Sequence, residues 1–83
     1  MPGARGFHSP QYRLLCNRLK KLRTDADMTQ RDLAAVLKLP QTYVHKIETG
    51  TRRIDPLELI QWCRATGCDP SDTIRQIELS VRR

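Results

Sequence analysis

Long hydrophobic runs are missing from this sequence of 83 residues. No apolar stretch approaches the roughly 18 residues that a membrane-spanning helix requires. The first residues also lack the hydrophobic segment of a secretory signal. We therefore expect a cytoplasmic protein with no membrane partner. At this length we expect a single domain with a small core.

Cysteine is scarce, and its spacing suggests no pairing. Cys16, Cys63 and Cys68 are odd in number and contain no CxxC pair. This argues against both a disulfide framework and a zinc finger. Buried free thiols are the simplest interpretation. A redox sensor formed by Cys63 and Cys68 is an alternative that nothing else in the sequence supports.

Residues arranged for catalysis or cofactor binding are also lacking. His8 and His45 are isolated, no spacing resembles a set of metal ligands or a nucleophile–base pair, and there is no glycine-rich phosphate loop. We expect no catalytic site, no metal, no cofactor and no small-molecule ligand. Aromatic residues make up 5 % of the chain and are scattered, which disfavours a stacking platform for single-stranded RNA.

Positive charge is what the chain does carry, and it is unevenly distributed. The formal net charge is +6. Residues 13–53 hold ten basic side chains against four acidic ones, whereas residues 54–83 hold four against five. This asymmetry favours an anion-binding part joined to a part with another task. A basic surface kept only for solubility is the alternative that charge alone leaves open.

Helix-start and helix-stop signals divide the chain into five short helices. Ser9, Thr29, Asp55 and Asp69 can each cap a helix N-terminus. Prolines and glycines supply further boundaries. The predicted helices run from Pro10 to near Thr24, from Thr29 to before Pro40, from Gln41 to Thr49, from Asp55 to Gly67, and from Asp69 onward. We expect residues 1–8 to form a flexible tail and residues 9–83 to form one domain.

Apolar residues at helical spacing give each helix a side to bury. These residues are Tyr12, Leu15, Leu19 and Leu22, then Leu33, Ala34 and Leu37, then Val44 and Ile47, then Leu59, Trp62 and Cys63, and finally Ile74, Ile77 and Val81. No alternating strand pattern of useful length is present. The sequence therefore predicts an all-α fold.

The stretch from Gln30 to Glu48 carries the most functional information. It predicts two short helices joined by a tight turn, and such helices must cross steeply, as in a helix-turn-helix that inserts its second helix in the DNA major groove. Ala34 is small enough for the close approach that this crossing needs. The outward residues of the second helix can hydrogen-bond base edges and phosphates. They are Gln41, Thr42, His45 and Lys46.

Three segments resemble a known family. They are Gln-Arg-Asp-Leu-Ala-Ala at 30–35, Pro-Gln-Thr-Tyr-Val-His-Lys-Ile-Glu-Thr-Gly at 40–50, and Arg-Arg-Ile-Asp at 52–55. Together they are similar to the Cro and phage-repressor type of helix-turn-helix, the XRE family, over roughly residues 10–78. The resemblance implies a five-helix, lambda-repressor-like domain. It also implies a bacterial or phage-encoded transcriptional regulator that binds double-stranded DNA sequence-specifically, with helix three in the major groove.

The resemblance also implies roles for individual residues. The base-reading positions are matched by Gln41, Thr42 and Lys46. The DNA-backbone positions are matched by Arg23, Gln30, Tyr43, His45, Arg52 and Arg53. Arg23 and Glu48 match a structural pair that joins the first helix to the third, although two unrelated surface charges are the alternative. For Tyr43, partly buried packing is as good an interpretation as contact with the backbone.

Two residues depart from the family pattern. Lys38 occupies a turn position where glycine is common, so a left-handed backbone there would cost roughly 1–2 kcal/mol. Thr66 stands where leucine is usual, which predicts looser packing of the fourth helix. Neither departure touches the expected reading surface.

A homodimer on a palindromic operator is expected as well. One reading helix recognises too few base pairs to be unique among ~10⁶–10⁹ competing sites. The candidate interface residues are Ile77, Leu79 and Val81, although Ile74 and Ile77 closing the monomer core is an equally good interpretation. A different class of function is an antitoxin-like or other protein-interaction module that binds a protein partner, with or without binding to its operator as well. Repression and activation are not distinguished.

Overall fold

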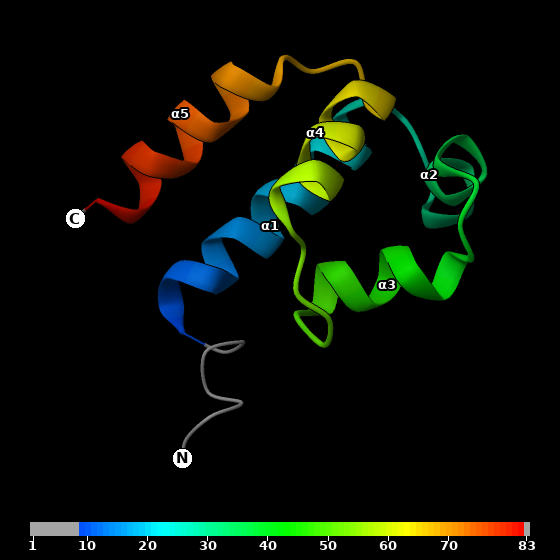
Figure 1. The fold of residues 1–83 in the computed structure, drawn as a ribbon, viewed down its shortest axis with the longest axis horizontal. Helices are drawn as coiled ribbons and strands as arrows, with labels where there is room; N and C mark the ends of the chain where they lie inside the picture. The colour runs from blue at the N-terminus through cyan, green and yellow to red at the C-terminus, as the bar shows by residue number, and fades with distance from the viewer. Residues whose placement is uncertain (1–8, 83) are drawn as a thin grey trace.

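The computed structural model describes residues 9–82, so the predicted tail at residues 1–8 lies outside the described residues. Within residues 9–82 the chain forms five helices and no strand (Figure 1). They are α1 (Pro10–Asp25), α2 (Gln30–Leu37), α3 (Gln41–Thr49), α4 (Pro56–Ala65) and α5 (Pro70–Val81). The predicted all-α class is confirmed.

Short polar side chains begin four of the helices, at the positions predicted. The Thr29 hydroxyl accepts from the backbone N–H of Asp32 at 3.0 Å, and the Asp32 carboxylate accepts from the backbone N–H of Thr29 at 2.9 Å. Asp55 and Glu58 form the same reciprocal capping box at the start of α4. These bonds satisfy N–H groups that have no partner inside the helix.

The turn between α2 and α3 passes through a left-handed residue. Lys38 has φ 60° and ψ 43°, and the chain reverses there with hydrogen bonds from the N–H of Lys38 to the carbonyl of Ala35 and from the N–H of Leu39 to the carbonyl of Ala34. Lys38 therefore adopts the strained conformation that glycine would take without cost. Gly50 has φ 82° and ends α3, as predicted.

The core lies where α1, α2, α3 and α4 meet. Its fully enclosed side chains include Leu19, Leu33, Val44, Ile47 and Trp62. The indole N–H of Trp62 donates to the carbonyl of Leu19 at 3.1 Å, so the largest core residue is buried with its polar atom satisfied.

Thr66 fits into the packing of α4 with its polar group satisfied. Its hydroxyl lies 3.0 Å from the carbonyl oxygen of Trp62 and 3.1 Å from that of Cys63. The side chain is buried. Its burial costs little, because the two carbonyl groups replace the water molecules to which the hydroxyl would otherwise hydrogen-bond.

The predicted stripe on α5 is partly wrong. Ile74 is 49 % exposed, and the fully buried residue of this helix is its neighbour Thr73. Ile77 and Val81 are half-buried. Thr73, Ile77 and Val81 repeat every four residues and so follow one side of the helix, whereas Ile74 lies about 100° away from Thr73. The small hydroxyl residue faces inward, and an isoleucine faces solvent.

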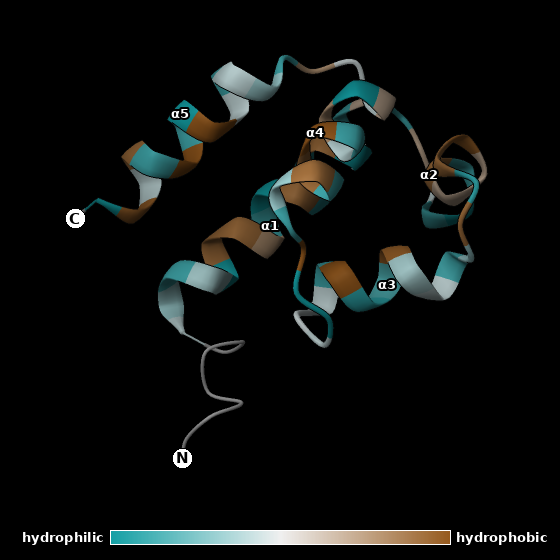
Figure 2. Cartoon of the chain, in the orientation of Figure 1, coloured by the Kyte–Doolittle hydropathy of each residue, from teal (hydrophilic) through white to brown (hydrophobic). Residues whose placement is uncertain are grey.

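The arrangement leaves α3 at an edge of the molecule. α3 packs on α2 and α1, α2 also packs on α4, and α5 closes against α1 and α4 (Figure 1). Figure 2 shows α3 alternating between hydrophobic and hydrophilic residues along its turns, as a helix with one buried side must. The longest helix has 16 residues, and among residues 9–82 no helix meets the length and hydropathy needed to cross a bilayer.

Candidate nucleic-acid interface

The outer side of α3 is polar and open to solvent. Gln41, Thr42, His45 and Lys46 are all exposed. On the inner side Val44 and Ile47 are completely buried, and they anchor the helix in the core. The four exposed residues therefore stand on a rigid support, and their side chains offer amide, hydroxyl, imidazole and ammonium groups for hydrogen bonding.

A buried ion pair fixes the orientation of α3 against α1. The Nε of Arg23 donates to Oε2 of Glu48 at 2.6 Å, and its Nη2 donates to Oε1 at 3.1 Å. Nη1 donates to the carbonyl of Met28 at 2.7 Å. The Arg23 side chain is 9 % exposed and that of Glu48 is 3 % exposed. A two-point pair of this kind holds both helices in one geometry.

Arg23 is largely buried in this fold, and its expected contact with the DNA backbone stays a prediction. All three guanidinium nitrogens make hydrogen bonds within the chain. The structure therefore shows Arg23 paired with Glu48. The sequence could not separate these roles, because burial depends on the packing of α1 against α3.

Gln30 extends the ion pair to the start of α2. Its Nε2 donates to Oε1 of Glu48 at 3.1 Å and lies 3.5 Å from Nδ1 of His45. Glu48 thus accepts from both α1 and α2 while belonging to α3. Three helices are joined at one carboxylate, directly beneath the exposed residues of α3.

Gln30 and Gln41 also line a shallow hollow of about 430 Å³ at the N-terminus of α2. Thr29 and Arg31 complete the rim, with Arg23 behind them. Arg31 is exposed and was not among the residues expected to contact DNA. Its position in the first turn of the helix, directly after Gln30, was the available signal. A helix N-terminus with an exposed arginine favours an anion at this place.

Comparison with known proteins agrees with this geometry. Residues 19–72 match a family model described as helix-turn-helix. The chain belongs to the XRE family of helix-turn-helix regulators. It is 35 % identical over 63 residues to "Control protein C.MunI" of a Mycoplasma species, covering 75 % of this chain and 85 % of that protein.

One solved structure of the same family is similar to this protein over nearly its whole length. The "XRE-family like protein from Pseudomonas syringae pv. tomato str. DC3000" is 36 % identical, with a TM-score of 0.83. The match covers 92 % of this chain and 93 % of that one. The chain is therefore a DNA-binding transcriptional regulator, and its family is one of regulators rather than enzymes.

The loop after α3 carries two arginines that stack on tyrosines. Arg52 lies 4.9 Å from the ring centroid of Tyr43, and Arg53 lies 4.7 Å from that of Tyr12. Arg52 also pairs with Glu58 through two bonds of 3.1 and 2.9 Å. Cation–π stacking of this kind restrains a loop that is otherwise exposed. Both guanidinium groups are thereby held close to the C-terminal end of α3.

Tyr43 is half-buried and packs against the core. Burial raises the pKa of its hydroxyl to about 12, and the neighbouring Glu58 carboxylate adds to this shift. The phenol therefore stays protonated at every physiological pH. Tyr43 thus has the partly buried position that the packing interpretation describes, and its contact with the DNA backbone stays a prediction.

Clusters suited to metal binding are not found among the described residues: no group of three or more His, Cys, Asp or Glu side chains is placed to hold an ion. Cys16 and Cys63 are buried free thiols, and burial raises the pKa of each. A protonated, enclosed thiol is unreactive.

Proposed function

We propose that this regulator binds a palindromic operator as a homodimer, with α3 of each copy in the major groove. The observation that carries the proposal is the exposure of Gln41, Thr42 and Lys46 on a helix whose other side is completely buried. Glutamine pairs with adenine through two hydrogen bonds, lysine with guanine O6 and N7, and the threonine methyl with that of thymine.

The DNA backbone has several partners around this helix. Gln30 and Arg31 lie at the N-terminus of α2, His45 lies beside Gln30, and Arg52 and Arg53 lie past the C-terminus of α3. A phosphate over each end of α3 would set the register of the reading residues between them. Tyr43 contributes by supporting Arg52 and does not itself need to reach the DNA.

The dimer is proposed to form through α5 and the neighbouring part of α1. Leu79 is 46 % exposed and Leu14 is 40 % exposed, and the two line one hollow with Gln76 and Ser80. Val81 is half-buried on the same helix, and Ile77 is half-buried where α5 packs on its own chain. A twofold axis through this apolar area would bury it and place two reading helices about 34 Å apart.

Selection of bound duplexes from a random pool tests the proposal. We expect a palindrome whose half-sites are centred one helical turn apart. Absence of any selected sequence, or a single unrepeated half-site, would contradict it.

Two variants separate base reading from backbone contact. Lys46→Ala is expected to relax the preference at one base pair by about 1–3 kcal/mol, because it removes a base contact. Arg53→Ala is expected to weaken all duplexes alike, because phosphates carry no sequence. Equal effects of the two variants on matched and mismatched operators would refute these roles.

A further inference from the structure

Two of the three cysteines lie at the junction of α4 and α5, and no role assigned so far uses them. The N–H of Cys68 donates to the carbonyl of Cys63 at 2.8 Å. The N–H of Gly67 donates to the carbonyl of Arg64 at 3.1 Å, and Gly67 is left-handed at φ 79°. Together these features form a Schellman ending, in which the residue after the glycine often packs its side chain on the third-last residue of the helix. Cys68 and Cys63 occupy those two positions.

The backbone bond also limits how far apart the two cysteines can be. Ordinary bond lengths on either side of the 2.8 Å hydrogen bond keep the Cα atoms of Cys63 and Cys68 within about 6.7 Å of each other. A disulfide usually joins residues whose Cα atoms are about 4.4–6.8 Å apart. The separation of the two residues is therefore one that a disulfide can span.

Thr73 of α5 brings both side chains to the same place. Asp69 caps α5, so Cys68 directly precedes the cap and Thr73 is the fourth helical residue, and these two positions pack together at many helix starts. The Thr73 side chain is buried and hydrogen-bonds to the Cys63 thiol. Burial is the main reason that the pKa of Cys63 is raised, and the neighbouring Cys68 side chain raises it further. The end of α4 and the start of α5 thus direct both thiols toward Thr73.

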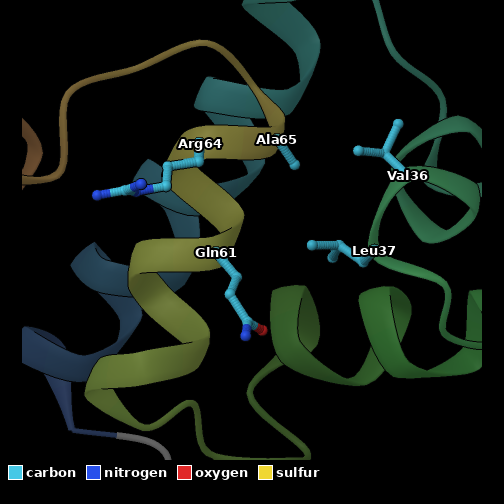
Figure 3. Close-up of a pocket in the computed structure, with 5 residues that line it drawn as sticks. All are labelled: Val36, Leu37, Gln61, Arg64 and Ala65. Atoms are coloured by element: carbon cyan, nitrogen blue, oxygen red, sulfur yellow. The ribbon is translucent and has the colours of Figure 1, made fainter.

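The two thiols differ in their access to solvent. Cys63 has no exposed surface, whereas Cys68 is half-buried. The open hollow between α4 and α2 does not reach Cys63 either. Its lining, drawn in Figure 3, consists of Val36, Leu37, Gln61, Arg64 and Ala65. A solute in water therefore meets the pair of cysteines at Cys68 first.

We propose that Cys63 and Cys68 are a redox pair that a hydroperoxide converts to an intramolecular disulfide. The Cys68 thiolate attacks one peroxide oxygen, so that an S–O bond forms while the O–O bond breaks, and the displaced oxygen takes up a proton and leaves as alcohol or water. Cys68 is then a sulfenic acid, oxidised by two electrons. The Cys63 sulfur next attacks the Cys68 sulfur, the S–S bond forms while the S–O bond breaks, and the hydroxyl leaves with the Cys63 proton as water. Cys63, enclosed in the fold, thus reacts only with its neighbour.

The disulfide would change the start of α5. Bonded sulfur atoms lie closer together than two thiols in contact, so Cys68 must move toward Cys63. The Cys63 sulfur also loses the proton of its thiol, which alters its hydrogen bond with Thr73. Both changes act on the first turn of α5, the helix that carries the proposed dimer contact Leu79. We expect the oxidised chain to bind operator more weakly, and this consequence, unlike the disulfide itself, rests on the proposed function.

Peroxide treatment of the reduced chain, followed by blocking of the remaining thiols and digestion with trypsin, tests the pair. Trypsin cleaves after arginine, so Cys16, Cys63 and Cys68 fall in the separate fragments 14–18, 54–64 and 65–75. We expect mass spectrometry to show fragments 54–64 and 65–75 joined, and dithiothreitol to separate them. Links to fragment 14–18, links between Cys68 residues of two chains, or oxygen uptake by Cys68 without a link would each overturn the proposal.

Three variants separate the roles of the thiols, and circular dichroism of each reduced variant checks its fold. Cys63→Ala leaves Cys68 without its partner, so peroxide should add oxygen to fragment 65–75 and form no link. Cys68→Ala changes a half-buried residue, so it is expected to fold, and Cys63 should then remain a thiol. Cys16→Ala changes a thiol outside the pair and should form the link as readily as the unchanged chain. Oxidation of Cys63 in Cys68→Ala at the unchanged rate would overturn the order of the two steps.

Operator binding of the reduced and oxidised chain tests the consequence for α5. We expect at least threefold weaker binding after oxidation, recovery with dithiothreitol, and no effect of peroxide on Cys68→Ala. Equal affinity of the two forms would overturn the proposed effect on α5. A chain that forms the disulfide but binds no duplex in either form would refute the proposed function and leave the redox pair standing.

Discussion

Single side chains do most of their work in this regulator by holding others in place. Glu48 accepts hydrogen bonds from Arg23 of α1 and Gln30 of α2, and its own helix carries the residues proposed to read bases. Its carboxylate is almost fully removed from water. Such a buried charge is tolerable only while its partners are present, because desolvation of an unpaired ion is costly.

Removing one partner of this pair should therefore strongly lower the stability of the fold. Arg23→Met is expected to lower the free energy of unfolding by about 3–5 kcal/mol, since it leaves the Glu48 carboxylate buried without its cation. Urea denaturation followed by circular dichroism measures this. Lys21→Ala provides the control: the Lys21–Asp25 pair is more than 60 % exposed on both sides and should contribute less than about 0.5 kcal/mol.

The double variant Arg23→Met with Glu48→Leu separates pairing from packing. Because it removes both charges together, it should recover most of the stability that Arg23→Met loses. It should still bind operator less tightly, since Gln30 loses the acceptor that orients it. A double variant as unstable as Arg23→Met alone would show that the pair is not the cause.

At the scale of the element, the turn before α3 contains a strained backbone residue at a point that determines how α3 is oriented. Lys38 is left-handed at φ 60°, and the turn it makes sets the angle at which the chain enters α3. The strain of a non-glycine residue in this region is roughly 1–2 kcal/mol, partly offset because glycine loses more backbone entropy on folding.

Lys38→Gly is accordingly expected to stabilise the chain by about 1 kcal/mol. For a domain of this size that corresponds to an increase of roughly 4–8 °C in the melting temperature, which differential scanning calorimetry measures. Lys38→Ala should bring no comparable gain, because alanine retains the Cβ that causes the strain. Equal melting temperatures for the two variants would contradict this account of the turn.

The carboxyl groups in the capping boxes of α2 and α4 make the stability of the fold depend on pH. The side-chain hydrogen bonds from Arg52 lower the pKa of Glu58, and the backbone hydrogen bond from Thr29 lowers that of Asp32. A carboxyl group whose pKa is lower in the folded state stabilises that state while it is ionised. This contribution is present above the ordinary values of 4.5 and 3.8 and is lost as the pH falls through the lowered ones.

The difference in unfolding free energy between the Glu58→Gln variant and the unchanged chain should therefore become smaller as the pH falls. At pH 7 the variant is expected to be about 1 kcal/mol less stable, since it loses charge-assisted bonds to Arg52. The gap should shrink as the pH falls below the ordinary value of 4.5 and Glu58 becomes protonated. Denaturant midpoints across pH 3 to 7 measure this, and a constant gap over that range would refute the assignment to Glu58.

At the scale of the whole molecule, the proposed homodimer would present two copies of α3 to the operator. The proposed interface combines Leu79 of α5 with Leu14 of α1, two residues 65 positions apart in the chain that line a common hollow. Both remain substantially exposed in the single chain. Burial of such an apolar area is the main source of free energy for association.

Leu79→Glu is expected to weaken dimerisation at least tenfold and to weaken operator binding with it, while the unfolding free energy of the single chain stays nearly unchanged. Analytical ultracentrifugation and duplex titration measure the two effects. Ile74→Glu is the matched control, since Ile74 is equally exposed on the same helix and does not line that hollow. Equal weakening by both variants would exclude the proposed interface.

The dependence of operator affinity on salt concentration tests the same protein–DNA complex. If the complex contacts six to ten phosphates, its affinity should fall by roughly 10³–10⁵ between 50 and 200 mM salt. Arg53→Ala should make this dependence shallower, whereas Lys46→Ala should leave the slope closer to that of the unchanged chain. A flat response to salt would contradict phosphate contact altogether.

The helices and their ends were determined by local sequence. Thr29 with Asp32, Asp55 with Glu58, and Gly50 act through hydrogen bonds or backbone freedom within a few residues, so neighbours in the chain are sufficient to predict them. The apolar periodicity that identified Val44 and Ile47 as buried is equally local. For the same reason the spacing of apolar residues along α3 was sufficient to identify its exposed side.

Burial and pairing across helices were decided only by the tertiary structure. The pairing of Arg23 with Glu48, the burial of Thr73 rather than Ile74, and the position of Arg53 over Tyr12 all depend on the angle at which one helix crosses another. The partners of these contacts lie up to 41 positions apart in the chain. Sequence specifies which side of a helix is apolar, but the packed core decides which neighbouring atoms that side meets.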